Sequence, residues 1–254
     1  MQKPQMMRLS FGSPWSPVVK VFIIINTFVF LSFLLVGDQI NPTFGVSYRN
    51  LLISVLGVDP SAILHNFTLW QLVSYLFVHE AFYHFLFNML GLWWFGSDVE
   101  RTIGSKRFLQ YYLFTGVGAG LISVLMGLPT IGASGSIYGL LLAYGLLFPD
   151  RVLYLYFVIP IKAKYCVLLF GLIELVALMG TSSMINHYAH LGGIFFGLLW
   201  FLYFSKKDTL LHTLREYQKR RRRKKFRVIS GSDSAPAGSS DEPGHPYEDK
   251  PTIH

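Results

Sequence analysis

The chain has 254 residues, of which 52% are hydrophobic and only 14% charged. That balance, with a mean hydropathy of +0.43, excludes an ordinary soluble domain and indicates an integral membrane protein. A single cysteine, Cys166, excludes an intrachain disulfide framework and a cysteine-based zinc site.

Apolar stretches follow a short N-terminal segment. Residues 1–17 carry three prolines and no apolar run, so we expect a cytoplasmic segment without a cleavable signal or transit peptide. A membrane-spanning helix needs roughly 20 apolar residues. Six stretches reach or approach that length, and we expect an all-α bundle of six transmembrane helices over residues 18–205. The predicted spans are residues 18–36, 81–98, 107–127, 133–148, 165–180 and 187–204.

The first loop, about residues 37–80, is unusually long. Its second half, "SAILHNFTLWQLVSYLF", is itself apolar, but it cannot be a further span without inverting every later loop. We expect this part to lie in the membrane interface or against the bundle. Trp70 and Tyr75 suit the level of the lipid headgroups.

The chain ends in a polar segment, residues 206–254. Seven successive basic residues, 219–225, precede a stretch rich in Ser, Pro, Gly and Asp whose composition indicates disorder. We expect the basic run to contact anionic lipid headgroups on the cytoplasmic side. Nucleic acid is disfavoured as a partner, because no stacking aromatics or folded reader accompany the run.

The stretch "FVHEAFYHFLFN", residues 77–88, places polar side chains in an apolar run, which is costly unless they are satisfied. Zinc proteases use His-Glu-x-x-His, with the histidines four apart on one helix face. Here His79 and His84 are five apart and point about 140° away from each other. We therefore expect no metal site, and we expect His79 and Glu80 in the wet mouth of a site.

His84 and Asn88, by contrast, are four residues apart and share one helix face. The imidazole and the carboxamide can then point toward the same place. The alternative is an interhelical hydrogen-bonded pair that holds the bundle together.

The stretch "TIGASGSIYGLLLAYG", residues 130–145, sets Ser134 between Gly132 and Gly135 at a helix start. It is not the Gly-x-Ser-x-Gly elbow of soluble hydrolases. The glycines allow a tight turn and bring backbone amides close to a reacting oxygen. The alternative is a set of small residues at a helix-packing surface.

His190 lies one turn inside the last predicted span, and Gly193 and Gly197 follow it as small-x-x-x-small, which permits close helix packing. Taken alone, His190 is equally consistent with a capped or lumen-facing histidine. However, four polar residues lie near the outer ends of their predicted spans, namely His84, Asn88, Ser134 and His190. That shared depth favours one aqueous site.

Together these motifs resemble the rhomboid family of intramembrane serine proteases, over about residues 18–204. The segment "FGSDVERTIGSKRF" also resembles the family's junction after the second span, through Glu100 and Gly104. One departure is visible, because the family's first loop often carries Trp-Arg where this chain has Trp70-Gln71. The departure questions the stability of the loop more than the chemistry. The matching motifs are His84-x-x-x-Asn88, Gly132-Ala133-Ser134-Gly135 and Ala189-His190-x-x-Gly193-x-x-x-Gly197.

The resemblance implies a cofactor-free serine endopeptidase that cleaves transmembrane substrates near the outer membrane face. It makes Ser134 the nucleophile and His190 the general base of a dyad, with Tyr138 packed beside the imidazole. His84, Asn88 and the Ser134 backbone amide would form the oxyanion hole. The absence of a seventh helix makes the chain similar to the mostly prokaryotic form, so we expect a bacterial plasma membrane. The supporting glycines are Gly132, Gly135, Gly193 and Gly197.

Two other functions compete with this one. A catalytically inactive relative that binds transmembrane helices would be indicated by loss of Ser134 or His190, and both are present. A transporter is disfavoured because neither an internal repeat nor a pair of broken helices is evident. Glu174, in the fifth predicted span, matches none of the expected roles.

The distribution of basic residues predicts the orientation in the membrane. With the N-terminus inside, 21 of the 22 Lys and Arg residues fall on the cytoplasmic side and only Arg49 falls outside. A reporter fused after residue 204 should therefore be cytoplasmic, and one inserted near Gly45 should be external. The opposite pattern would overturn the predicted geometry of the site as well.

Overall fold

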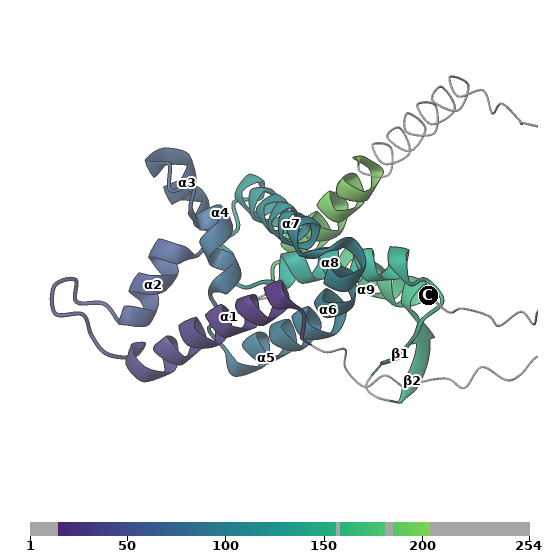
Figure 1. The fold of residues 1–254 in the computed structure, drawn as a ribbon. Helices are drawn as coiled ribbons and strands as arrows, with labels where there is room; N and C mark the ends of the chain where they lie inside the picture. Colours follow the sequence, from purple (N-terminus) through teal and green to yellow (C-terminus); the bar gives the residue numbers. More distant parts are fainter. Residues whose placement is uncertain (1–14, 156–157, 181–184, 204–254) are drawn as a thin grey trace, which may run out of the picture. The chain divides into compact units, whose positions relative to one another are not determined.

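The computed structural model of the chain describes residues 15–155, 158–180 and 185–203. Contacts divide the chain into the units Met1–Lys207 and Asp208–His254, and every described residue belongs to the first. The predicted polar tail and most of the N-terminal segment therefore lie outside the described residues. Figure 1 shows the fold of the first unit.

The described part of the chain is mostly helical, and a helix covers each of the six predicted spans. Among the residues that the structure describes, two helices are by length and composition alone able to cross a membrane, Pro17–Leu35 and Ser105–Leu125. The helices are α1 (Pro17–Val36), α2 (Tyr48–Leu56), α3 (Pro60–Asn66), α4 (Gln71–Ser74), the 3₁₀ turn η1 (Tyr75–Phe77), α5 (Phe82–Gly91), the π turn η2 (Leu92–Gly96), α6 (Ser97–Ile103), α7 (Ser105–Leu125), α8 (Ser134–Leu147), α9 (Ala163–Ala177) and a last helix over 187–203.

The all-α prediction is wrong at one point. The loop between α8 and α9 forms an antiparallel hairpin of β1 (Val152–Leu155) and β2 (Ile159–Lys162). Both strands are rich in β-branched and apolar residues, and the proline sits in a two-stranded ribbon, where edge positions tolerate it. The predicted spans 133–148 and 165–180, with the orientation given above, leave this stretch between them on the cytoplasmic side and predict no strand in it.

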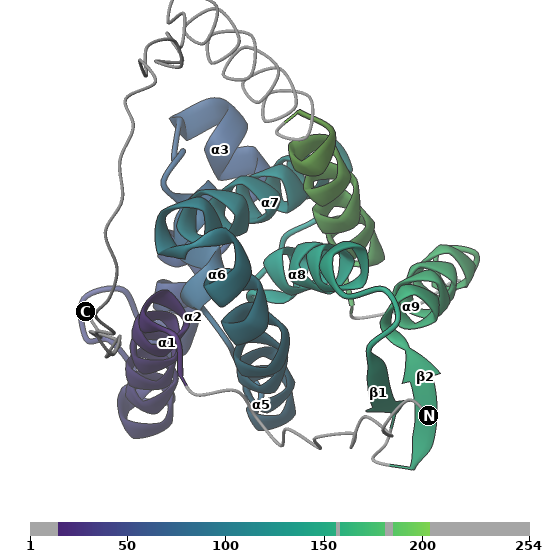
Figure 2. The same ribbon diagram turned by 45° about the vertical axis from the view of Figure 1, so that its right-hand side comes forward.

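Helix α8 is central to the arrangement, because α7 packs against it on one side and α9 on another (Figure 2). The outward faces of α1 and α9 remain strongly apolar. Phe28 and Leu35 of α1, and Leu168 and Val176 of α9, are each more than half exposed. Exposed apolar faces on this scale indicate a lipid environment.

The first loop folds into α2, α3 and α4 and is held by Gln71, the residue at which the family pattern is broken. Gln71 is 1% exposed, and its amide accepts from Asp59 N–H at 3.0 Å and donates to the Ser54 carbonyl at 2.9 Å. The indole N–H of Trp70 donates to the Val55 carbonyl at 2.9 Å. A glutamine with both ends satisfied can therefore organise this loop without an arginine.

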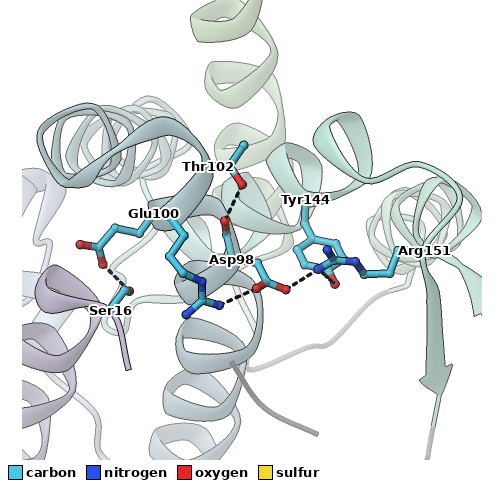
Figure 3. Close-up of polar contacts among 7 residues, drawn as sticks. Ser16, Asp98, Glu100, Thr102, Tyr144 and Arg151 are labelled. Carbon is cyan, nitrogen blue, oxygen red and sulfur yellow. Dashed lines mark hydrogen bonds and ion pairs between the residues drawn. The ribbon is translucent and has the colours of Figure 1, made fainter. Parts of the chain in front are cut away.

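Glu100, in α6, caps the start of α1. Its carboxylate accepts hydrogen bonds from the Ser16 hydroxyl (Figure 3), from the N–H groups of Val18 and Val19 at 3.0 Å each, and from the Ser105 hydroxyl at 2.6 Å. These backbone donors belong to the first turn of α1, which has no partner for them within the helix. Burial opposes ionisation of Glu100, but the four donors together lower the pKa of its carboxyl below the ordinary value.

Asp98, two residues earlier, ties the same junction to the loop after α8. Its carboxylate bonds Arg101 at 2.6 Å. It also pairs with Arg151, as Figure 3 shows. The Arg151 guanidinium in addition donates to the Tyr144 hydroxyl at 3.1 Å and lies 4.1 Å from the centre of the Phe148 ring. The start of α6 and the end of α8 are thereby held together.

Replacing Glu100 by Gln should lower the unfolding temperature of the detergent-solubilised protein, at a cost of about 2 kcal/mol or more, because hydrogen bonds to an ionised group are lost. Since folding lowers the pKa of Glu100, its stabilisation should be present above the ordinary glutamate pKa of about 4.3 and disappear as pH falls below that value. Thermal unfolding from pH 7 down to well below the ordinary glutamate pKa measures both effects. The exposed Glu80→Gln is the matched control, and an equal loss in both variants would contradict the capping role.

Candidate functional site

The segment that leads into α8 is fixed by the first loop. Val58 and Thr130 exchange backbone hydrogen bonds, at 2.9 and 3.1 Å. The Gly132 N–H donates to the Tyr75 carbonyl at 2.8 Å, and the Tyr75 hydroxyl donates to the Gly116 carbonyl of α7 at 2.7 Å. The backbone just before Ser134 is therefore held from two directions.

Gly132 is required by both conformation and space. Its φ is +101°, where side chains are strained, and a Cβ there would lie 2.4 Å from Nε2 of His84. The imidazole of His84 thus rests against the backbone two residues before Ser134. A glycine at this position allows the two groups to approach.

The structure brings Ser134 and His190 into direct contact, although 56 residues separate them. Ser134 Oγ lies 2.8 Å from His190 Nε2, within hydrogen-bonding distance. The Tyr138 ring, one turn further along α8, stacks on the imidazole with 4.3 Å between ring centres and 13° between planes. Rotation of the imidazole is therefore restricted, and its Nε2 faces the serine.

Glycines allow the last helix to reach this position. A Cβ on Gly193 would lie 1.9 Å from the Gly135 carbonyl oxygen, so the two helices touch backbone to backbone one turn from the Ser134–His190 pair. A Cβ on Gly197 would lie 2.6 Å from the Tyr111 hydroxyl. Both glycines of the predicted small-x-x-x-small motif face neighbouring helices.

Asn186, to which the sequence analysis assigned no role, fixes the start of the last helix. Its Oδ1 accepts the Ala189 N–H at 3.1 Å, which is the bond of an N-cap. Its Nδ2 donates to the Ser123 hydroxyl at 2.9 Å and also contacts the Thr130 hydroxyl. An asparagine just before a helical apolar pattern was the signal available for this role.

His79 does not lie in a wet mouth, as the sequence analysis expected. It is 0% exposed, and its Nε2 accepts the Ala133 N–H at 3.3 Å. Burial and then the neighbouring His84 lower the pKa of His79 to about 3, so the imidazole is neutral and can act as an acceptor. The side chain supports the backbone before Ser134, while Glu80 is exposed.

Asn88 is buried, and its side chain turns back along its own helix. Nδ2 donates to the His84 carbonyl at 2.7 Å. A carboxamide nitrogen carries two hydrogens, so this bond leaves a second donor on Asn88. The helix places Asn88 one turn below His84, as the four-residue spacing predicted.

Glu174 is the second residue that the sequence analysis left without a role. Its Oε1 lies 3.0 Å from His190 Nδ1, on the side of the ring opposite Ser134, and its Oε2 lies 2.5 Å from His187 Nδ1. The Glu174–His190 contact has ion-pair distance but lies off the direction of a good hydrogen bond. The Tyr138 hydroxyl also donates to Glu174. Within the described residues, Glu174, His187 and His190 form a group whose ligand atoms all lie within 4.8 Å of one another.

Comparison with known proteins matches residues 66–207 to the Rhomboid domain family. The chain is 27% identical to Rhomboid protein 1, mitochondrial, of Saccharomyces cerevisiae in an alignment of 194 positions that covers 62% of this chain and 54% of that protein. It is 35% identical over 98 residues to the Rhomboid protease GluP of Bacillus subtilis, which is 38% of this chain and 19% of that protein. It is 33% identical to the rhomboid protease YdcA of Bacillus subtilis in an alignment of 147 positions that covers 55% of this chain and 69% of that protein. The chain thus spans about half or less of several relatives.

Replacing Gly193 by Ala should force the last helix away from α8 by about 1 Å, because the new methyl group would overlap the Gly135 carbonyl. If Ser134 and His190 react together as the resemblance implies, a displacement of that size would lower the rate about 100-fold. Cleavage of a transmembrane substrate and thermal unfolding should both be measured. The control is Gly171→Ala in α9, whose Cβ would meet only Ile194, at 3.9 Å; equal activity in the two variants would show that the close contact is not needed.

Proposed function

This chain belongs to the rhomboid family, and from that premise we propose that it is an intramembrane serine endopeptidase that cleaves transmembrane helices near the outer membrane face. The observation that carries the proposal is the 2.8 Å contact between Ser134 Oγ and His190 Nε2, made between two helices whose residues are mostly apolar. A polar pair of that kind is costly unless it has a use. A catalytically inactive helix-binding protein would have no need for the contact.

In the proposed mechanism the neutral imidazole of His190 accepts the proton of Ser134 as Oγ attacks the scissile carbonyl. The imidazolium that forms then gives its proton to the leaving amine, and a water molecule repeats the cycle on the acyl-enzyme. Tyr138 keeps the imidazole plane in place by stacking. Glu174, 3.0 Å from Nδ1, stabilises the positive charge that develops on the ring.

The negative oxygen of the tetrahedral intermediate needs donors that are already in position. Ser134 is the first residue of α8, so its backbone N–H has no partner within the helix. His84 rests against the turn at Gly132, and Asn88 retains a second amide hydrogen. We assign these three groups to the oxyanion hole, with His79 holding the preceding backbone.

The protein is an integral membrane protein of the rhomboid family, whose substrates are in general membrane proteins. Six spans over residues 18–205, with both termini cytoplasmic, would put the site at the outer face. Residues 1–17 and the basic tail, 206–254, would then lie at the cytoplasmic surface of a bacterial plasma membrane, the tail against anionic lipid. Substrates with weak helices should be preferred, because a stable helix hides its carbonyls in hydrogen bonds.

The pair of proposed reacting groups should behave as one unit. Ser134→Ala and His190→Ala should each lower cleavage of a transmembrane substrate by at least about 1,000-fold, and the double variant should be no worse than either single one. Purified protein in detergent or liposomes gives the rates, and chelators should not reduce the activity of the unsubstituted chain. Substantial cleavage by Ser134→Ala, free of contaminating proteases, would overturn the proposal.

Replacing the proposed oxyanion donors should affect kcat and KM differently. His84→Ala and Asn88→Ala should each lower kcat by about 100-fold or more while KM changes little, because the donors act on the transition state. Steady-state kinetics gives the effects on kcat and on KM separately, and thermal unfolding checks that each variant is folded. If a folded His84→Ala, Asn88→Ala double variant kept full activity, the pair would instead be an interhelical structural contact.

A further inference from the structure

A cluster of three metal-ligand side chains stands beside the proposed reacting pair. Glu174 comes from α9, and His187 and His190 come from the first turn of the last helix, three residues apart on one face. The two carboxylate oxygens of Glu174 each face a ring nitrogen, at 2.5 Å from His187 Nδ1 and 3.0 Å from His190 Nδ1. The side chains are 5%, 13% and 11% exposed for Glu174, His187 and His190.

These three ligands suit a divalent cation that is intermediate between hard and soft. Two imidazole nitrogens and one carboxylate oxygen are typical ligands of zinc, which binds them at about 2.0–2.2 Å. Ligand atoms around a tetrahedral ion then lie about 3.3–3.5 Å from one another. The three groups already lie within 4.8 Å of one another, so small side-chain movements would complete three corners, with water in the fourth.

We propose that Glu174, His187 and His190 bind a divalent cation of the zinc class, and that the bound ion reversibly inhibits the protease. The inhibitory part rests on the proposed function. The ligand atom of His190 is Nδ1, because Nε2 faces Ser134. An ion on Nδ1 leaves the single proton of a neutral imidazole on Nε2. That nitrogen then donates to Ser134 Oγ and no longer accepts its proton.

Inhibition therefore needs no displacement of the ring from Tyr138. The ion also neutralises the Glu174 carboxylate, which otherwise stabilises the positive charge developing on His190. Catalysis itself requires no metal, whereas an excess of the ion stops it. The cluster escaped the sequence analysis because Glu174 lies 13 residues before His187, on a different helix.

The test separates binding from inhibition. Co²⁺ added to the purified full-length protein in detergent should give the visible absorption of a four-coordinate ion at one equivalent, and Zn²⁺ should displace it. Ser134→Ala, which lacks the nucleophile, should bind Co²⁺ equally well, so binding can be scored even if the chain has no protease activity. If the unsubstituted chain produces no such spectrum and takes up no Zn²⁺ by calorimetry, the metal site is excluded.

Inhibition is then compared between variants, each relative to its own metal-free rate. Zn²⁺ should inhibit the unsubstituted chain and the control His65→Ala, an exposed histidine of α3, with recovery on adding EDTA. His187→Ala should need at least about 10-fold more Zn²⁺, since even outer-shell partners of metals account for 10- to 100-fold. His187→Gln is the second variant should the first unfold. Equal Zn²⁺ sensitivity in His65→Ala and a folded His187 variant would overturn the proposal.

Discussion

The proposed chemistry depends on one close contact, at which the backbones of α8 and the last helix touch through Gly135 and Gly193. A single Cβ at Gly193 would overlap the Gly135 carbonyl oxygen at 1.9 Å. Ser134 precedes one of these glycines and His190 lies one helical turn before the other. The two helices can come this close because both residues at their crossing are glycines. That close approach brings Oγ of Ser134 to 2.8 Å from Nε2 of His190.

A second constraint is that polar groups in apolar surroundings must find partners within the protein. Several such side chains form hydrogen bonds with backbone groups that have no partner within their own helix or loop. Glu100 accepts the first N–H groups of α1, Gln71 bonds the backbone of the first loop, and His79 accepts the Ala133 N–H. The Gln71 bonds support the first loop, the His79 bond supports the turn before Ser134, and the Glu100 bonds hold the start of α1. Stability and placement of the site thus depend on the same buried polar residues.

Much of this arrangement could be predicted from the sequence, because helix spans and short-range spacing are local properties. The apolar lengths predicted where helices lie, and four-residue spacing correctly placed Asn88 one turn from His84. Partners from distant segments could not be derived in the same way. Nothing local to Glu174 indicates that α9 directs it at two histidines of another helix, and nothing local to His79 distinguishes a buried acceptor from an exposed mouth residue. The β1–β2 hairpin was missed because its strands are short and lie between two strongly apolar helices.

Identification of the nucleophile would test the account most directly. The purified protein should be treated with a fluorophosphonate, which reacts with an activated serine hydroxyl, and the modified peptide should be sequenced. We expect one modified residue, Ser134, and we expect labelling to be lost when His190 is replaced by Ala although the protein stays folded. Modification of a different serine, or undiminished labelling of Ser134 without His190, would contradict it.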